Sequence, residues 1–98
     1  MQKITAKDII YLETDNRRVK IVTTMGIFYS PDLIDYWEKK LTHISFYRIH
    51  KSYILNLDHI EQYKRNEVKL TSGEIIGISY RKQSAFRNYF YNYLKRRK

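Results

Sequence analysis

Residues 46–56 read FYRIHKSYILN and carry the most informative pattern in this 98-residue chain. Two short apolar runs suited to β-strands enclose a polar and basic centre made of Arg48, His50, Lys51 and Ser52. Lys and Arg bind phosphates or guanine edges, and a serine hydroxyl can bond to a phosphate or a base edge. The stretch therefore predicts two strands joined by a turn that can contact a nucleic acid.

Strand-like runs continue on both sides of this unit. Short apolar or alternating runs bounded by turn residues are typical of β-strands. Asp, Asn, Ser and Gly at 14–17, 25–26, 56–59 and 72–73 favour the intervening turns. The predicted strands are residues 8–13, 19–24, 27–29, 46–49, 53–55, a run that begins at Ile60, 68–71 and 76–78. We therefore expect one mainly β domain over residues 1–98, without internal repeats.

A short central helix is predicted after Ser30-Pro31-Asp32. Serine caps free amides, proline fits the first helical position, and an acidic residue suits the positive end of the helix dipole. Leu33, Trp37 and Leu41 follow at helical spacing. We expect about three turns, covering one face of a sheet.

The C-terminal residues 87–98 are expected to form a basic, aromatic helix. Phe86, Tyr89, Phe90, Tyr93 and Leu94 recur at spacings of three and four. We interpret this stripe as docking onto the domain's own sheet, the alternative being contact with another subunit or a neighbouring domain. The basic end at 95–98 suits the negative end of the helix dipole.

The charge balance favours a polyanionic partner. Nineteen Lys and Arg against ten Asp and Glu give a net charge of +9. Such a field attracts nucleic acids, although membrane surfaces are also anionic. The chain has no cysteine, and its apolar runs are too short to span a bilayer. We expect a cytoplasmic protein without a membrane partner.

The ordered motifs resemble the LytTR family of bacterial DNA-binding domains. Residues 46–56 resemble the family's F-x-R-x-H-x-S pattern, followed by an aliphatic residue and Asn. Residues 9–13, 59–60, 72–73 and 78–81 also resemble the family pattern in order, so the likeness covers roughly residues 8–86. The resemblance implies an elongated β fold of about ten short strands. It also implies a transcription regulator, often joined to a receiver domain and controlled by a sensor kinase.

The resemblance further implies how duplex DNA is bound. Three loops, at 15–18, 50–52 and 79–82, would enter successive major grooves on paired direct repeats near a promoter, with a second subunit alongside. Carried over by position, the base-reading candidates are Arg17 or Arg18, Lys51 and Arg81. The wider set of expected DNA contacts is Arg17, Arg18, Arg48, His50, Lys51, Ser52, Arg81 and Lys82.

Some of these residues also have structural interpretations. The ring of His50 is expected to bond to nearby backbone and hold its loop, with phosphate contact as the alternative. Arg48 is expected to anchor its strand or touch the DNA backbone. Lys64, Arg65 and Lys69 are interpreted as a solvated basic face that raises affinity through counterion release.

Two other function classes compete with DNA binding as interpretations of the sequence. Three singly spaced histidines, without paired carboxylates or a Gly-rich phosphate loop, do not form a catalytic motif. We therefore expect no enzyme activity, cofactor or metal. The alternative is an RNA-binding or general polyanion-binding β module, in which Tyr11, Phe46, Tyr47 and Tyr53 would stack on unpaired bases.

Overall fold

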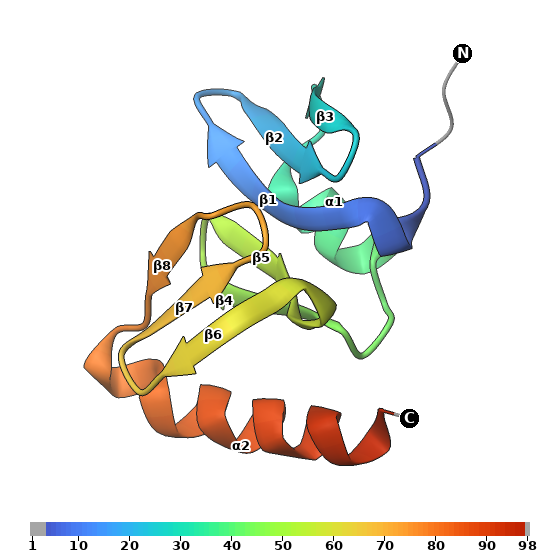
Figure 1. Cartoon of the computed structure of the whole chain (residues 1–98). Helices are drawn as coiled ribbons and strands as arrows, with labels where there is room; N and C mark the ends of the chain where they lie inside the picture. Colours follow the sequence, from blue (N-terminus) through green and yellow to red (C-terminus); the bar gives the residue numbers. More distant parts are fainter. Residues whose placement is uncertain (1–3, 98) are drawn as a thin grey trace.

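The computed structural model describes residues 4–97 and contains two antiparallel sheets and two α-helices (Figure 1). Short 3₁₀ turns at Ala6–Asp8 and Leu57–His59 precede β1 and β6. The strands are β1 (Ile9–Asp15), β2 (Arg18–Thr23), β3 (Gly26–Ser30), β4 (Phe46–His50), β5 (Tyr53–Asn56), β6 (Ile60–Lys64), β7 (Glu67–Leu70) and β8 (Ile75–Gly77). The helices are α1 (Ile34–Lys40) and α2 (Tyr80–Arg96). The mainly β prediction is confirmed, with eight strands among the described residues instead of the roughly ten implied by the resemblance.

The larger sheet has the strand order β3-β2-β1-β5-β4, and the smaller one β6-β7-β8. Strand β1 lies at the centre of the larger sheet, where Leu12 pairs with Ile21 of β2 and Ile54 of β5. Alternate residues of a strand face opposite sides of its sheet. Buried residues on both faces of β1 therefore require cover on both sides of this sheet.

The two faces of the larger sheet belong to different cores. Leu12 and Ile54 pack with Ile34 of α1 on one face. On the other face, Tyr11 and Leu55 join the core shared with the smaller sheet and α2. The molecule measures 38 × 30 × 25 Å, so its elongation is modest.

Helix α1 begins later and is shorter than the sequence predicted. The Oγ of Ser30 accepts hydrogen bonds from the backbone amide of Asp32 and from Nε1 of Trp37, at 3.1 and 3.0 Å. Ser30 thus stabilises the approach to the helix instead of capping it. Leu33 occupies the N-cap, and the helix has seven residues, about two turns.

The packing of α2 confirms the prediction that its aromatic stripe docks onto the domain's own sheets. The helix begins at Tyr80, well before residue 87. Phe86, Phe90 and Tyr93 are buried in the shared core. The hydroxyl of Tyr89 donates a 2.7 Å hydrogen bond to the carbonyl of Ile44, which ties the helix to the segment before β4. The helix runs beneath the smaller sheet in Figure 1.

Candidate nucleic-acid interface

Three segments that are distant in sequence are spaced along one edge of the molecule, which we call the three-segment edge (Figure 1). They are residues 15–18, 50–52 and 79–82. The amide of Thr14 donates a 2.9 Å hydrogen bond to the carbonyl of Ser52, joining the first two segments. Nζ of Lys82 lies 3.4 Å from the carbonyl oxygen of Ile49, which joins the third. In Figure 1 the β1–β2 turn lies at the upper left and the start of α2 at the lower left.

The first segment is a two-residue turn that places Arg17 at its tip. Asp15 pairs with Arg18 across the hairpin, and Asn16 between them has a φ of 60°. Asn tolerates this left-handed conformation better than most residues. The guanidinium of Arg18 lies 3.8 Å from the ring centre of Tyr29 and 3.7 Å from a carboxylate oxygen of Asp15. Within residues 4–97 no ion pair or ring contact engages the exposed Arg17.

The second segment is held by Arg48. Its Nη1 donates to the carboxylates of Asp35 and Glu38 in α1, at 2.6 and 2.8 Å. Its Nη2 donates to the backbone carbonyl of Lys51. The register of β4 against β5 shifts just before this turn, as expected for a bulge that redirects side chains. Arg48 therefore fastens the turn to α1, while the side chain of Lys51 stays exposed.

His50 and Ser52 shape the same turn through a local bond. The amide of Ser52 donates to Nδ1 of His50 at 3.2 Å, as the structural interpretation of this histidine predicted. This leaves Nδ1 as an acceptor and the proton of the neutral ring on Nε2. An exposed Nε2–H remains able to donate to a phosphate oxygen.

The third segment is helical, so its prediction as a loop is wrong. Ser79 occupies the N-cap, and residues 80–82 form the first turn of α2. The side chain of Arg81 is exposed, and no carboxylate within the described part of the chain pairs with it. Arg81 therefore projects from a rigid element, which limits the conformational entropy lost on binding.

Tyr11 and Tyr53 lie behind the second segment, with ring centres 5.7 Å apart. Burial, with the negative charges of Glu74 and Glu13, raises the pKa of Tyr11 to about 12. Burial and Glu13 likewise raise the pKa of Tyr53. Both phenols stay neutral at physiological pH and add no negative charge to the edge.

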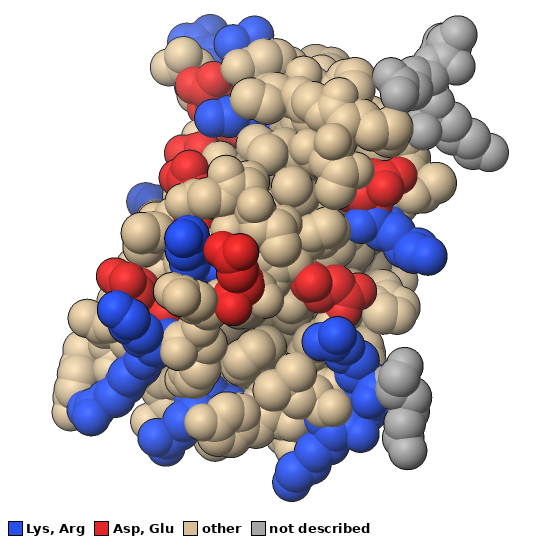
Figure 2. Space-filling model, in the orientation of Figure 1, with Lys and Arg blue, Asp and Glu red and all other residues tan. Residues whose placement is uncertain are grey.

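Positive charge is unevenly spread over the surface. Figure 2 shows Lys and Arg at the top and along the lower part of the face, with Asp and Glu interspersed between them. The three-segment edge includes seven of the eight predicted contact residues, and Arg48 lies just before its second segment. Arg18, Arg48 and Lys82 already contact other parts of the protein. Arg17, Lys51 and Arg81 have the freest cationic side chains of the edge.

The structure adds three residues that the sequence did not single out, and it places beside them Arg65, which the sequence analysis interpreted as part of a solvated basic face. Gln83, Ser84 and Arg87 extend the third segment along α2, and Arg65 approaches them from the β6–β7 turn. Tyr80–Gln83 carries no apolar repeat that would reveal a helix. Only the fold brings Arg65 to these residues.

Over residues 4–97 there is no group of three or more His, Cys, Asp or Glu side chains placed to hold a metal ion. Neither of the helices in that range is long and apolar enough to cross a bilayer.

The sequence is similar to those of known sensory transduction proteins. The chain is 29% identical over 90 residues to the sensory transduction protein LytR of Staphylococcus haemolyticus, covering 87% of this chain and 35% of that protein. It is 32% identical over 59 residues to the sensory transduction protein LytT of Bacillus cereus, covering 60% of this chain and 24% of that protein. The chain thus spans well under half the length of these relatives.

The fold also matches a solved structure. The LytTr DNA-binding domain of a DNA response regulator from Bacillus cereus superposes with a TM-score of 0.75 at 22% identity, covering 88% of this chain and 84% of that one. A family model described as the LytTr DNA-binding domain matches residues 1–91. The chain therefore belongs to the LytTr DNA-binding domain family.

Proposed function

We propose that this chain binds duplex DNA sequence-specifically, as the DNA-binding part of a bacterial transcription regulator. The observation that carries the proposal is the three-segment edge. Two hydrogen-bonded links hold three cationic segments together, and each segment presents one unpaired cation: Arg17, Lys51 or Arg81. Membership of a DNA-binding family supports this non-enzymatic role.

The mechanism divides the residues of the edge by what their side chains already contact. Arg81 is the first candidate for reading a base, because arginine donates two hydrogen bonds to one guanine edge. Arg17 takes this role in the first segment in preference to Arg18, whose guanidinium is stacked on Tyr29. Lys51 serves the second segment, and His50 and Ser52 contact phosphates.

The wider assembly is also part of the proposal. Segments on one edge would enter successive major grooves, and two copies would occupy paired direct repeats near a promoter. Since the chain covers 24–35% of the relatives named above, we propose that it acts together with a signal-receiving segment such as a receiver domain.

The RNA-binding alternative is less well supported by the packing. Tyr11 and Phe46 are buried in the two cores, at 3% and 9% exposure, and Tyr47 and Tyr53 are half-buried. Rings in these positions do not offer open faces for stacking on unpaired bases. Competition of single-stranded RNA and structured RNA against a specific DNA duplex for binding to this chain tests directly whether DNA is preferred over RNA.

The proposal is tested by selection from a random duplex DNA library near physiological salt. We expect a short motif, repeated at a fixed helical spacing. Arg81→Ala should then cost about 1–3 kcal/mol on that motif and relax the preference at one base pair. Salt-sensitive binding without any motif would make the chain a general polyanion binder. Unchanged affinity and base preference in Arg81→Ala would remove the third segment from the reading surface.

A further inference from the structure

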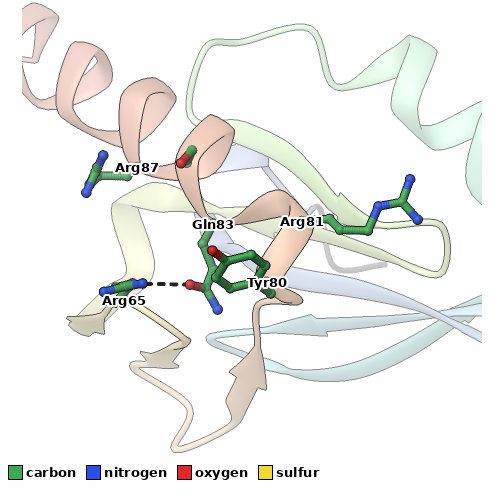
Figure 3. Close-up of a pocket in the computed structure, with 6 residues that line it drawn as sticks. Arg65, Tyr80, Arg81, Gln83 and Arg87 are labelled. Carbon is green, nitrogen blue, oxygen red and sulfur yellow. Dashed lines mark hydrogen bonds between the residues drawn. The ribbon is translucent and has the colours of Figure 1, made fainter.

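An open pocket of about 630 Å³ lies beside the first two turns of α2 (Figure 3). Arg65 reaches it from the β6–β7 turn, and all the other lining residues belong to α2. The lining residues are Arg65, Tyr80, Arg81, Gln83, Ser84 and Arg87. Half of these residues are arginines, so the pocket is strongly cationic.

The charge of this pocket is not neutralised by the protein. In the part of the chain that the structure describes, Arg65, Arg81 and Arg87 form no ion pair with a carboxylate. The first turn of α2 contains no acidic residue. Its free amides and the helix dipole add further positive potential. An anion bound here would relieve repulsion that the folded chain leaves uncompensated.

Gln83 fixes the direction of Arg65. Nε2 of Gln83 donates to the carbonyl of Ile78 at 3.0 Å, which turns the Oε1 of the same amide toward Arg65. Nε of Arg65 lies 3.4 Å from that oxygen, as the dashed line in Figure 3 marks. The two terminal nitrogens of Arg65 remain available to a ligand.

The helix places the side chain of Arg81 on a different side of the pocket from those of Arg65 and Arg87 (Figure 3). Tyr80, Ser84 and Arg87 follow one another at i, i+4 and i+7, so they share one face of α2. In Figure 3 Arg81 points away from Arg65 and Arg87, which lie together on the opposite side. One short segment can therefore contact two different parts of a ligand.

We infer that Arg65 and Arg87 clamp one phosphodiester of the DNA backbone, beside the groove that Arg81 enters. This inference rests on the proposed function. Guanidinium groups donate paired hydrogen bonds to phosphate oxygens, and the Ser84 hydroxyl adds a donor. The pocket is open and Tyr80 is 78% exposed, so the site is too solvated to hold free phosphate tightly. When Arg81 holds a base of the same DNA, the neighbouring phosphate is kept close to the pocket and binds Arg65 and Arg87 at a high effective concentration.

The test measures DNA affinity against salt for the wild type, Arg65→Ala, Arg87→Ala and the double variant. Lys95→Ala is the matched control, because it removes one exposed charge near the other end of α2. We expect each pocket variant to bind about tenfold more weakly to the selected and to random duplexes alike. Because both arginines share one phosphate, the plot of log K against log salt should be less steep for the double variant than for the wild type. The slope should differ by about 0.9, and not by twice that value. The control should change neither quantity appreciably.

A second arm locates the phosphate on the DNA. Single neutral methylphosphonate linkages are placed at successive positions of the selected duplex. We expect one position at which neutralisation weakens the wild type, weakens Arg65→Ala and Arg87→Ala less, and has little effect on the double variant.

The outcomes separate this inference from the proposed function. Pocket variants that behave like Lys95→Ala would overturn the clamp while leaving Arg81 and sequence-specific binding intact. If the wild type selects no motif, the proposed function fails, and the salt slopes on random duplex still decide the clamp. Inorganic phosphate that displaces DNA more strongly than chloride at equal ionic strength would instead make this a free-phosphate site.

Discussion

Replacing Arg48 by lysine tests whether the contacts of Arg48 with α1 and with Lys51 hold the second segment in place. The Arg48 side chain is 23% exposed and bridges Asp35, Glu38 and the carbonyl of Lys51. Its planar fork reaches α1 through one nitrogen and the turn through another. Lysine keeps the positive charge but has a single ammonium group, so it cannot reproduce both contacts at once. The substitution therefore separates geometry from charge.

The expected magnitude follows from the exposure of the partners. Asp35 and Glu38 are 72% and 52% exposed, so each ion pair contributes about 1 kcal/mol or less. A hydrogen bond from a charged donor contributes about 1.5–3 kcal/mol, and less here because water can reach the Lys51 carbonyl. We expect Arg48→Lys to lower the free energy of unfolding by about 1–2 kcal/mol. DNA affinity should fall roughly tenfold as the turn loosens, which corresponds to about 1.4 kcal/mol.

The assay combines urea denaturation with DNA titration at several salt concentrations. Because the guanidinium of Arg48 is already bonded to Asp35, Glu38 and Lys51, we expect it not to contact phosphate, so the slope of log K against log salt should stay unchanged. Arg96→Lys makes the same chemical change at an exposed helical position and should leave stability and affinity as they are. In Arg48→Ala, which also removes the charge, a slope reduced by about one unit would mean direct phosphate contact and refute the reasoning. Unchanged stability and affinity in Arg48→Lys would refute it equally.

Three other predictions address the first segment, the core and the pH dependence. Arg17→Ala should weaken specific DNA binding by about 1–3 kcal/mol, and Arg18→Ala should weaken it by less. Titration of each variant with the selected duplex measures both losses. A larger loss in Arg18→Ala would mean that Arg18, and not Arg17, reads the base. Phe86→Ala, at a fully buried position, should cost about 3–5 kcal/mol of stability in urea denaturation. The pKa of Tyr11 is raised from 10.0 to about 12, so its contribution to stability is complete below pH 10 and is lost as pH rises through 12. The free energy of unfolding of Tyr11→Phe should therefore fall less between pH 9 and pH 11 than that of the wild type. Identical decreases would mean that Tyr11 does not contribute to the pH dependence of stability.

The strands were predictable because their signal is local. Alternation and turn residues mark each run, and every predicted run corresponds to a strand in the structure. The start of α1 was misplaced because Ser30 offers the chemistry of a cap, but its Oγ serves Asp32 and the Trp37 indole instead. That choice depends on where Trp37 packs, which local sequence does not encode.

The candidate site was predictable only in part, for a related reason. Arg17, Lys51 and Arg81 were found by position in a family pattern, but no local feature tells which cations are already engaged. Stacking of Arg18 on Tyr29 is a contact between two strands. The bridge from Arg48 to α1 joins residues 10 and 13 positions apart. Such contacts exist only once the chain is folded.

Under the proposed function, these contacts hold two turns and the first turn of α2 in a fixed shape before DNA binds. Contacts at the ends of the segments help to fix their shape: Thr14 bonds to Ser52, Arg48 to Lys51, and Lys82 to Ile49. The entropy of ordering these turns is therefore largely lost on folding and need not be lost again on binding. We therefore propose that the engaged cations set the shape of the edge, whereas the unengaged ones supply its DNA affinity and sequence preference. Net charge alone would not distinguish the two groups.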